Sequence, residues 1–305
     1  MTATYLTVGE ALTDIVTRAD GDSTEYPGGS PLNVAVALGR LGHSSHLLTM
    51  IGQDARGEQI RRHVEESRVQ LTGGSIGPEP TSTALAMIDA EGTATYQFDI
   101  AWAPRETGLP EHVDALHTSS IAAVLSPGAA TVASVLERYR PTATISYDPN
   151  ARPSLMGSAA QTRPAIEAII ARADVVKTSD EDVAWLYGTD DVEDVVASWR
   201  ELGPAITVLT RGGEGAVGFA AAGRIAVDPV KVEVADTVGA GDTFSAGLLD
   251  ALGTAGLLGA VQREGLHAIG AEQLRTVLAR AARLAAVTVS RPGANPPWAH
   301  EIDGA

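Results

Sequence analysis

The sequence Asp236-Thr237-Val238-Gly239-Ala240-Gly241-Asp242, followed by Thr243-Phe244-Ser245-Ala246-Gly247, places two aspartates around a glycine-rich turn that leads into an apolar run. Glycine allows a ligand to approach the backbone closely. The first amides of a helix are unpaired and, with the helix dipole, favour an anion such as phosphate. Asp242 is placed to accept a proton from a group that attacks the phosphate. The stretch therefore predicts a phosphoryl-transfer site if a helix begins there, and an ordinary loop-to-helix junction capped by Asp242 is the alternative.

Length, charge and cysteine content narrow the classes of protein to be considered. The chain has 305 residues, enough for a large core, and 44% of them are hydrophobic, which is ordinary for a globular protein. It carries 22 Lys+Arg against 38 Asp+Glu, a net charge of −16, which argues against nucleic acid or an anionic membrane as the main partner. Without cysteine it has no disulfide framework and no thiol nucleophile. Because Glu10 and Asp14 interrupt the first apolar segment and no long apolar run follows, we expect a cytoplasmic protein.

From Pro110 onward, strand-like apolar runs alternate with helical patterns. Such alternation predicts a doubly wound α/β fold, with a mainly parallel sheet and helices on both faces. The expected strands are 4–9, 46–51, 115–119, 142–148, 175–178, 205–210, 215–220 and 224–227, and the expected helices are 32–41, 56–69, 128–139, 164–172, 180–187, 192–201, 242–258 and 272–289. Ligands of such folds bind beyond the carboxyl ends of the strands. The loops expected to converge there are 9–14, 28–33, 148–152, 177–182, 210–215 and 236–242.

Two hairpin patterns precede this alternation. One is centred on Asp20-Gly21-Asp22, and the other on Ala90-Glu91-Gly92, which joins the strand-like runs 82–89 and 93–100. The two hairpins are expected to pair into one small sheet. We therefore predict a single domain over residues 1–305 with a small β lid formed from about residues 12–27 and 82–104.

Two longer motifs resemble the signatures of the ribokinase-like (PfkB) sugar kinases. The run Gly28–Ala35, with Gly42 and Gly52, is similar to the N-terminal signature of that family, and Asp236–Leu249 is similar to its second signature. Shorter family-like pieces occur at 51–57, 147–153, 177–182, 210–215 and 290–297. Because each signature constrains many positions and the pieces extend over nearly the whole chain, the resemblance favours phosphoryl transfer at the 236–242 turn over a simple helix cap.

The resemblance implies ATP-dependent phosphorylation of a sugar hydroxyl. Asp242 would be the general base, and the amides of Gly239, Ala240 and Gly241 would form an anion hole for the transferring group. Catalysis of this kind is mainly positioning and electrostatics, so few groups suffice. The residues implied for sugar recognition are Asp14, Gly28, Gly29 and Asn33.

Nucleotide binding is implied along the glycine-rich turn 210–215 and in the C-terminal loop. The residues concerned are Ser179, Asp182, Thr210, Gly212, Gly215 and Asn295. The family commonly carries an Asn-x-x-Glu motif near the phosphates and magnesium, and here Ser179 and Asp182 occupy its two ends, a departure that keeps one carboxylate. Mg²⁺ would be held by phosphates and waters more than by protein. Several family members also bind K⁺ beside the anion hole. The candidate ligands here are Asp236 and the carbonyls near Val238, of Ala286–Ser290 and near Gly293.

A neutral sugar is favoured as the acceptor. The segments 148–153 and 290–297 look most like those of bacterial fructokinases, which favours fructose. Family kinases for keto-deoxy sugar acids usually carry an arginine near the lid to meet the carboxylate, whereas this chain has Tyr96-Gln97-Phe98-Asp99 there. Arg105 follows this segment closely in the sequence and could meet a carboxylate, so an acidic sugar remains an alternative substrate. Ribokinase and 2-keto-3-deoxygluconate kinase activity are therefore the alternatives within the class.

Two other classes of function fit the sequence less well. A sugar- or nucleotide-binding protein without turnover is the alternative, and the intact 236–242 turn argues against it. A dinucleotide-dependent dehydrogenase does not fit, because Gly9 does not begin a G-x-G-x-x-G spacing. The alternating Tyr96, Phe98 and Trp102 are expected on one strand face, packed in the core or lid. The expected partners are a sugar and ATP, and a homodimer formed through the lid is left open.

Overall fold

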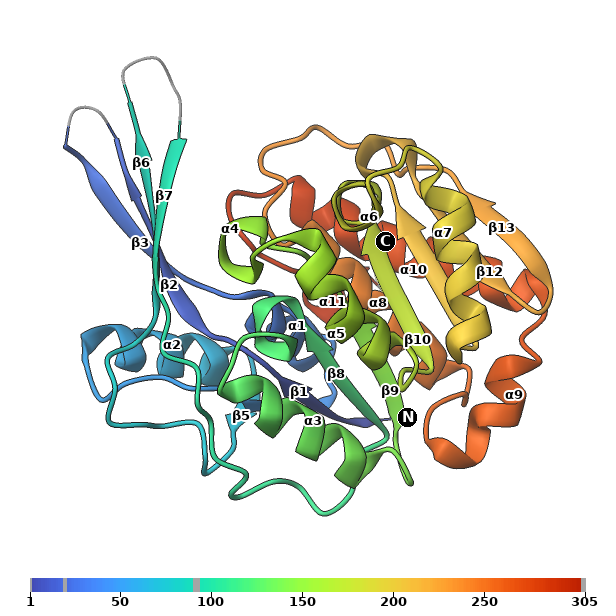
Figure 1. Cartoon of the computed structure of the whole chain (residues 1–305), viewed down its shortest axis with the longest axis horizontal. Helices are drawn as coiled ribbons and strands as arrows, with labels where there is room; N and C mark the ends of the chain where they lie inside the picture. Colours follow the sequence, from blue (N-terminus) through green and yellow to red (C-terminus); the bar gives the residue numbers. More distant parts are fainter. Residues whose placement is uncertain (1, 19–20, 90–93, 303–305) are drawn as a thin grey trace.

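The computed structural model describes residues 2–18, 21–89 and 94–302. Its body is a nine-stranded sheet in the order β13-β12-β11-β10-β9-β8-β1-β4-β5 (Figure 1). Neighbouring strands from β11 to β5 are parallel, and β12 and β13 run antiparallel at one edge. The strands are β1 (Thr4–Val8), β4 (Ser44–Leu48), β5 (Val69–Leu71), β8 (Ala115–Ser119), β9 (Thr144–Asp148), β10 (Val175–Ser179), β11 (Ile206–Thr210), β12 (Ala216–Ala220) and β13 (Gly223–Val227). The predicted mainly parallel α/β fold is confirmed.

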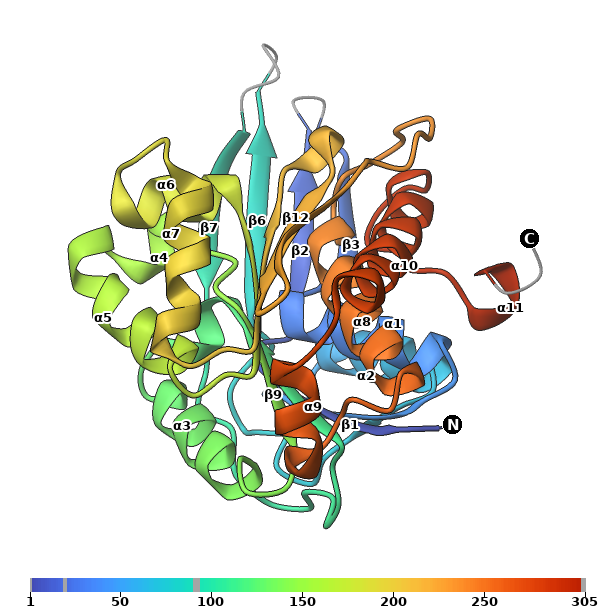
Figure 2. The ribbon, with the colours of Figure 1, turned by 90° about the vertical axis from the view of Figure 1, so that its right-hand side faces the viewer.

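Helices cover both faces of this sheet, which is why every residue of β8 and β9 is buried. Figure 2 shows α1, α2, α8 and α10 on one side and α3, α5, α6 and α7 on the other. The first group is α1 (Ser30–Arg40), α2 (Ala55–Glu66), α8 (Ala240–Thr254) and α10 (Ala271–Val289); the second is α3 (Gly128–Tyr139), α5 (Ala159–Ile170), α6 (Asp180–Tyr187) and α7 (Val192–Ser198). The short helices are α4 (Pro153–Met156), α9 (Arg263–His267) and α11 (Ala299–Ile302). In the described part of the chain, no helix is long and apolar enough to cross a membrane.

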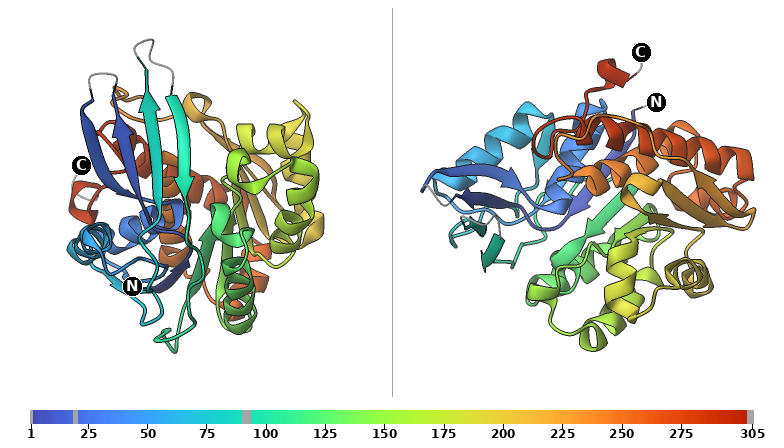
Figure 3. Two further views of the ribbon diagram at one scale, coloured as in Figure 1. Left: turned by 60° about the vertical axis from the view of Figure 1, so that its left-hand side comes forward. Right: turned by 90° about the horizontal axis from the view of Figure 1, so that it is seen from above.

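The two hairpins form a second sheet of four strands, in the order β3-β2-β6-β7. It consists of β2 (Leu12–Thr17), β3 (Ser23–Gly28), β6 (Thr83–Ile88) and β7 (Ala94–Asp99). Strands β2 and β6 pair in parallel and join the two antiparallel hairpins, as expected from the sequence. This lid projects beyond the body (Figure 3). The predicted turn Ala90–Gly92 and residue Asp20 lie outside the described residues.

Several expected element boundaries were wrong. Helix α8 begins at Ala240 rather than Asp242, because Gly239 adopts a left-handed conformation with φ 75° and becomes the N-cap. Helix α5 begins at Ala159 rather than Pro164, because the Ser158 hydroxyl and amide both donate to Gln161 Oε1 and start the helix earlier. Trp102 does not share a strand face with Tyr96 and Phe98. It lies beyond β7 and is buried in the core of the body, where its indole N–H donates to the Ala122 carbonyl.

Candidate active site

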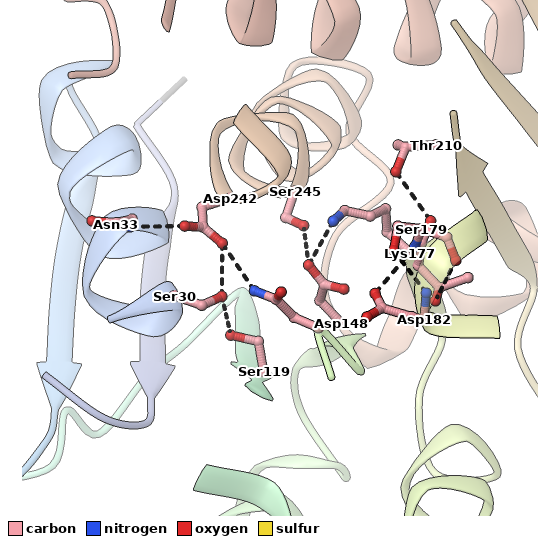
Figure 4. Close-up of polar contacts among 12 residues, drawn as sticks. Ser30, Asn33, Ser119, Asp148, Lys177, Ser179, Asp182, Thr210, Asp242 and Ser245 are labelled. Atoms are coloured by element: carbon pink, nitrogen blue, oxygen red, sulfur yellow. Dashed lines mark hydrogen bonds and ion pairs between the residues drawn. The ribbon is translucent and has the colours of Figure 1, made fainter. Parts of the chain in front are cut away.

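The first turns of α1 and α8 meet at Asp242, whose carboxylate is buried. The Ser30 hydroxyl donates to Oδ1 at 2.7 Å and Asn33 Nδ2 donates to Oδ2 at 2.8 Å (Figure 4). Asn150 Nδ2, from the loop after β9, lies 3.4 Å from Oδ1. A carboxylate oxygen has two lone pairs, so these bonds orient Asp242 and still leave room to accept a hydroxyl proton. The arrangement suits a general base.

The turn before Asp242 is tightly packed. A methyl group at Gly239 would lie 2.6 Å from the Cβ of Ala294, so with its positive φ the position accepts only glycine without strain. The Ala240 amide donates to the Thr237 carbonyl at 3.3 Å. Within the described residues, the amides of Gly239 and Gly241 have no acceptor. Two of the three predicted anion-hole amides are therefore free for a ligand.

Asp236, at the other end of the turn, has both carboxylate oxygens engaged. Oδ1 accepts from the Val238 amide at 3.0 Å and Oδ2 from the Gly293 amide at 2.9 Å. The Val289 carbonyl, one of the candidate cation ligands, accepts the amides of Ala235 and Asp236. In this structure the Asp236 side chain joins the turn to the C-terminal loop, and its role at a K⁺ site stays a prediction. No group of three or more His, Cys, Asp or Glu that could hold a metal lies within the described ranges.

A cleft of about 1100 Å³ opens between the lid and these first turns. Of the predicted residues, those lining it are Asp14, Gly29, Asn33, Asp236, Gly239, Gly241, Asp242 and Asn295. Gly28 is not among the residues that line the cleft. A methyl group there would lie 1.9 Å from Asp14 Oδ2 and displace that carboxylate, so the small size of Gly28 leaves room for Asp14. Gly29, with φ 110°, is the N-cap of α1, and a methyl group there would lie 2.5 Å from the Glu10 carbonyl oxygen.

Sequence reasoning missed several charged residues that line the same cleft, among them Glu10 and Arg152 at its inner end and the arginines Arg18 and Arg40. Burial raises the pKa of Glu10 to about 8 and that of Asp14 to about 6, against the opposing effect of the Arg152 guanidinium. Glu10 Oε2 is buried without a hydrogen-bond partner among the described residues. The signal available in the sequence was an acidic residue directly after an apolar strand, at the end of the sheet where ligands bind.

The residues predicted for nucleotide binding fall into two groups. At the ends of β10 and β11, Ser179 and Asp182 cap α6 reciprocally, with the Asp182 amide donating to Ser179 Oγ at 3.1 Å. Asp182 Oδ1 also accepts the Ala151 amide at 2.8 Å, and Thr210 Oγ1 donates to the Thr178 carbonyl. Gly212 and Gly215 have positive φ in the turn after β11. Asn295 lies in a separate network, where its side chain accepts from Arg40.

Comparison with known proteins places this geometry in a family. The model of the family described as "pfkB family carbohydrate kinase" matches residues 3–301 of this chain. A fructokinase from Rhizobium leguminosarum bv. trifolii is 36% identical over 258 residues, which cover 81% of this chain and 79% of that protein. A fructokinase from Escherichia coli is 29% identical over 303 residues, covering 96% and 95% of the two chains.

Solved structures share the fold. A fructokinase from Xylella fastidiosa with bound ATP has a TM-score of 0.80 at 24% identity, covering 96% of this chain and 94% of that one. A Vibrio cholerae fructokinase double mutant with fructose, ADP and potassium ion has a TM-score of 0.77 at 22% identity, with the same coverage. The family match over nearly the whole length and the 36% identical relative show that the chain belongs to the pfkB family of carbohydrate kinases, and the solved structures show that it shares their fold.

Proposed function

We propose that this kinase transfers the γ-phosphoryl group of ATP to a hydroxymethyl group of a neutral sugar, with fructose as the favoured acceptor. The observation that carries the proposal is the Asp242 carboxylate, held by Ser30 and Asn33 beside the free amides of Gly239 and Gly241 on the cleft wall. The names of the relatives, fructokinases from R. leguminosarum and E. coli, support fructose.

The chemistry follows from this arrangement. Asp242 accepts the proton of the sugar hydroxyl while the hydroxyl oxygen forms a bond to the γ-phosphorus. The bond from that phosphorus to the β–γ bridging oxygen breaks, and ADP leaves with the electron pair. The Gly239 and Gly241 amides, at the positive end of α8, stabilise charge on the transferring group. Mg²⁺ would arrive on the nucleotide phosphates, and K⁺ beside the turn would be held by backbone carbonyls.

A neutral acceptor fits the charges at the inner end of the cleft. The Asp242 carboxylate opposes ionisation of both Glu10 and Asp14 there, and the Arg152 guanidinium favours it. An acidic sugar would add a further negative charge to this group. Arg105, which kept an acid substrate open, does not line the cleft and points to the Ile76 carbonyl.

The lid supplies the other wall of the acceptor site. Tyr96 and Phe98 stack with a centroid distance of 6.3 Å and, with Asp14, line the cleft. We propose that residues 1–305 form one catalytic unit whose lid, about 12–27 and 82–104, covers the sugar. Sedimentation at several protein concentrations will test whether the chain forms a homodimer.

The test is a coupled ADP-release assay with fructose, ribose and 2-keto-3-deoxygluconate, each with and without Mg²⁺ and K⁺. We expect the highest kcat/KM with fructose. A strong signal with the sugar acid and none with fructose would refute the choice of substrate. Calorimetric binding of sugar and ATP without ADP release from any acceptor would instead support a binding protein without turnover.

A further inference from the structure

We propose that Lys177, held by Asp148 beneath the glycine turn, is a positioning residue for phosphoryl transfer. Its ammonium group adds positive charge at the anion hole and fixes the segment that orients Asp242. The proposal rests on the kinase activity proposed above and concerns residues to which the sequence patterns assigned no role in the reaction.

The pair is buried in the centre of the site. Lys177, in β10, donates from Nζ to Asp148 Oδ2 at 2.7 Å, and both side chains are almost completely buried. Ser245 Oγ, from α8, lies 3.4 Å from the same oxygen. Figure 4 shows the pair between Asp242 on one side and the Ser179 and Asp182 cap on the other. It therefore connects the part of the site assigned to the acceptor with the part assigned to the nucleotide.

The ammonium group lies directly under the predicted anion hole. A methyl group at Gly241 would lie 2.9 Å from Lys177 Nζ, so the lysine reaches the second residue of α8, whose amide is free. A cation is unfavourable at the N-terminus of a helix, where the dipole is positive. The same position strengthens the attraction of the free amides for an anion. The position of the Lys177 ammonium group therefore disfavours helix α8 and favours binding of a phosphoryl group.

The lysine carries its charge in this site. Burial lowers the pKa of Lys177, but the carboxylates of Asp148, Asp182 and Asp242, with Asp148 foremost, more than offset this, and the net shift is upward. Buried ion pairs contribute little to stability compared with apolar residues of the same size, because both charges lose their hydration. A charged pair here is consequently better explained by what it does to the site than by stability of the fold.

One short segment carries the effect of the pair to the catalytic base. Asp148 accepts from Lys177, Asn150 Nδ2 approaches Asp242 Oδ1, and the Ala151 amide donates to Asp182. Asp148 Oδ1 is already buried without a partner among the described residues. Removing the ammonium would leave the Asp148 carboxylate with only the 3.4 Å contact from Ser245 Oγ, and segment 148–151 would shift to relieve it, taking Asn150 away from Asp242.

The first test is Lys177→Met, measured with the best acceptor sugar. Loss of one group that stabilises a developing anion typically lowers kcat by ~100-fold or more, and we expect a loss of that size with KM for the sugar changed by less than about threefold. Affinity for ADP with aluminium fluoride, which mimics the transferring group, should fall by at least about tenfold, while affinity for ADP alone stays within about twofold. Unchanged kcat and unchanged aluminium fluoride binding would overturn the proposal.

Two further variants separate positioning from folding. Lys177→Met/Asp148→Leu replaces the pair by apolar side chains and is expected to fold at least as well as the wild type while kcat stays low. Recovery of kcat with recovery of stability would show that the pair is only structural. Arg263→Met is the matched control. It breaks the ion pair of Arg263 with the buried carboxylate of Asp174, at 2.7 Å, and Asp174 directly precedes the first residue of β10, at the end of the strand away from the site.

The control also separates this proposal from the assignment of function. Arg263→Met should lose stability and keep the wild-type kcat. If neither the wild type nor this control releases ADP with any sugar, the proposed function fails. If both are active and the two Lys177 variants are equally active, the function stands and the positioning role fails.

Discussion

The two ends of the 236–242 turn carry the same side chain in different surroundings. Asp242 is buried and is held by side-chain donors, the hydroxyl of Ser30 and the amide of Asn33. Asp236 is only partly buried and is held by backbone amides, those of Val238 and Gly293. Side-chain donors from α1 fix the orientation of the Asp242 carboxylate in the cleft. Backbone donors instead make the Asp236 carboxylate a link between the turn and the C-terminal loop. The comparison assigns chemistry to one aspartate and loop structure to the other.

The largest expected effect is that of Asp242→Asn. Because the amide cannot accept the hydroxyl proton, kcat should fall by ~1000-fold, within the range that general-base catalysis contributes. Melting temperature and calorimetric sugar affinity should stay near those of the wild type. A variant that keeps near-wild-type kcat would remove the distinction between the two aspartates.

The second prediction concerns Asp236→Ala, which removes two acceptors from the turn without touching the base. We expect kcat/KM to fall about tenfold and the free energy of unfolding in urea to fall by about 2 kcal/mol, as for two lost hydrogen bonds. Asp236→Asn, which keeps one acceptor oxygen, should lose about half as much. If raising the K⁺ concentration restores Asp236→Ala, the side chain acts on a cation and its assignment to the loop is wrong.

The third prediction compares two neighbouring serines. Ser30 Oγ hydrogen-bonds to Asp242, whereas the hydrogen bond found for Ser119 Oγ among the described residues is the one with Ser30 Oγ, at 2.8 Å. Loss of a hydrogen bond to a charged group costs ~1.5 kcal/mol or more, so Ser30→Ala should lower kcat about tenfold. Ser119→Ala should change kcat by less than about twofold. Equal losses in the two variants would mean that orientation of Asp242 does not depend on the direct contact.

The last prediction concerns the pH dependence of stability and leaves the catalytic rate aside; the group is Glu10, which lines the cleft beside Asp242. In the folded protein the pKa of Glu10 is raised from 4.5 to about 8, so between these values the folded chain holds a proton that the unfolded chain releases. Stability from this group is present below pH 4.5 and is lost as the pH rises toward 8. Glu10→Gln should remove a slope on the order of 1 kcal/mol per pH unit at most, measured by urea unfolding from pH 5 to 8. Parallel curves for variant and wild type would contradict the raised pKa.

Local patterns in the sequence were sufficient for the α/β class and for many of the elements. The strand–helix alternation after Pro110 predicted α3 and α6 with their observed bounds and the predicted hairpins paired into the lid. The second signature pointed to Asp242 and to the turn before it. These features depend on periodicity, turn residues and short spacings, which a single stretch of chain carries by itself.

The start of α8 was decided by tertiary contacts. The sequence placed it at Asp242, but Ala294 packs against Gly239 and the turn closes two residues earlier. Within the turn itself, the Ala240 amide donates to the Thr237 carbonyl, and the amides of Gly239 and Gly241 are left without an acceptor among the described residues. Local propensity could not provide this, because Ala294 comes from the C-terminal loop.

The sequence by itself determined the layered α/β fold, the kinase signatures and the identity of the candidate base. Only the tertiary structure decided which side chains hold that base and where the buried charges lie. Ser30 and Asp242 are 212 residues apart, and Lys177 meets Asp148 because β9 and β10 are neighbours in the sheet. The physical reason is that a buried carboxylate needs donors within about 3 Å, and the order of the strands and the packing of α1 on α8 determine which donors arrive there.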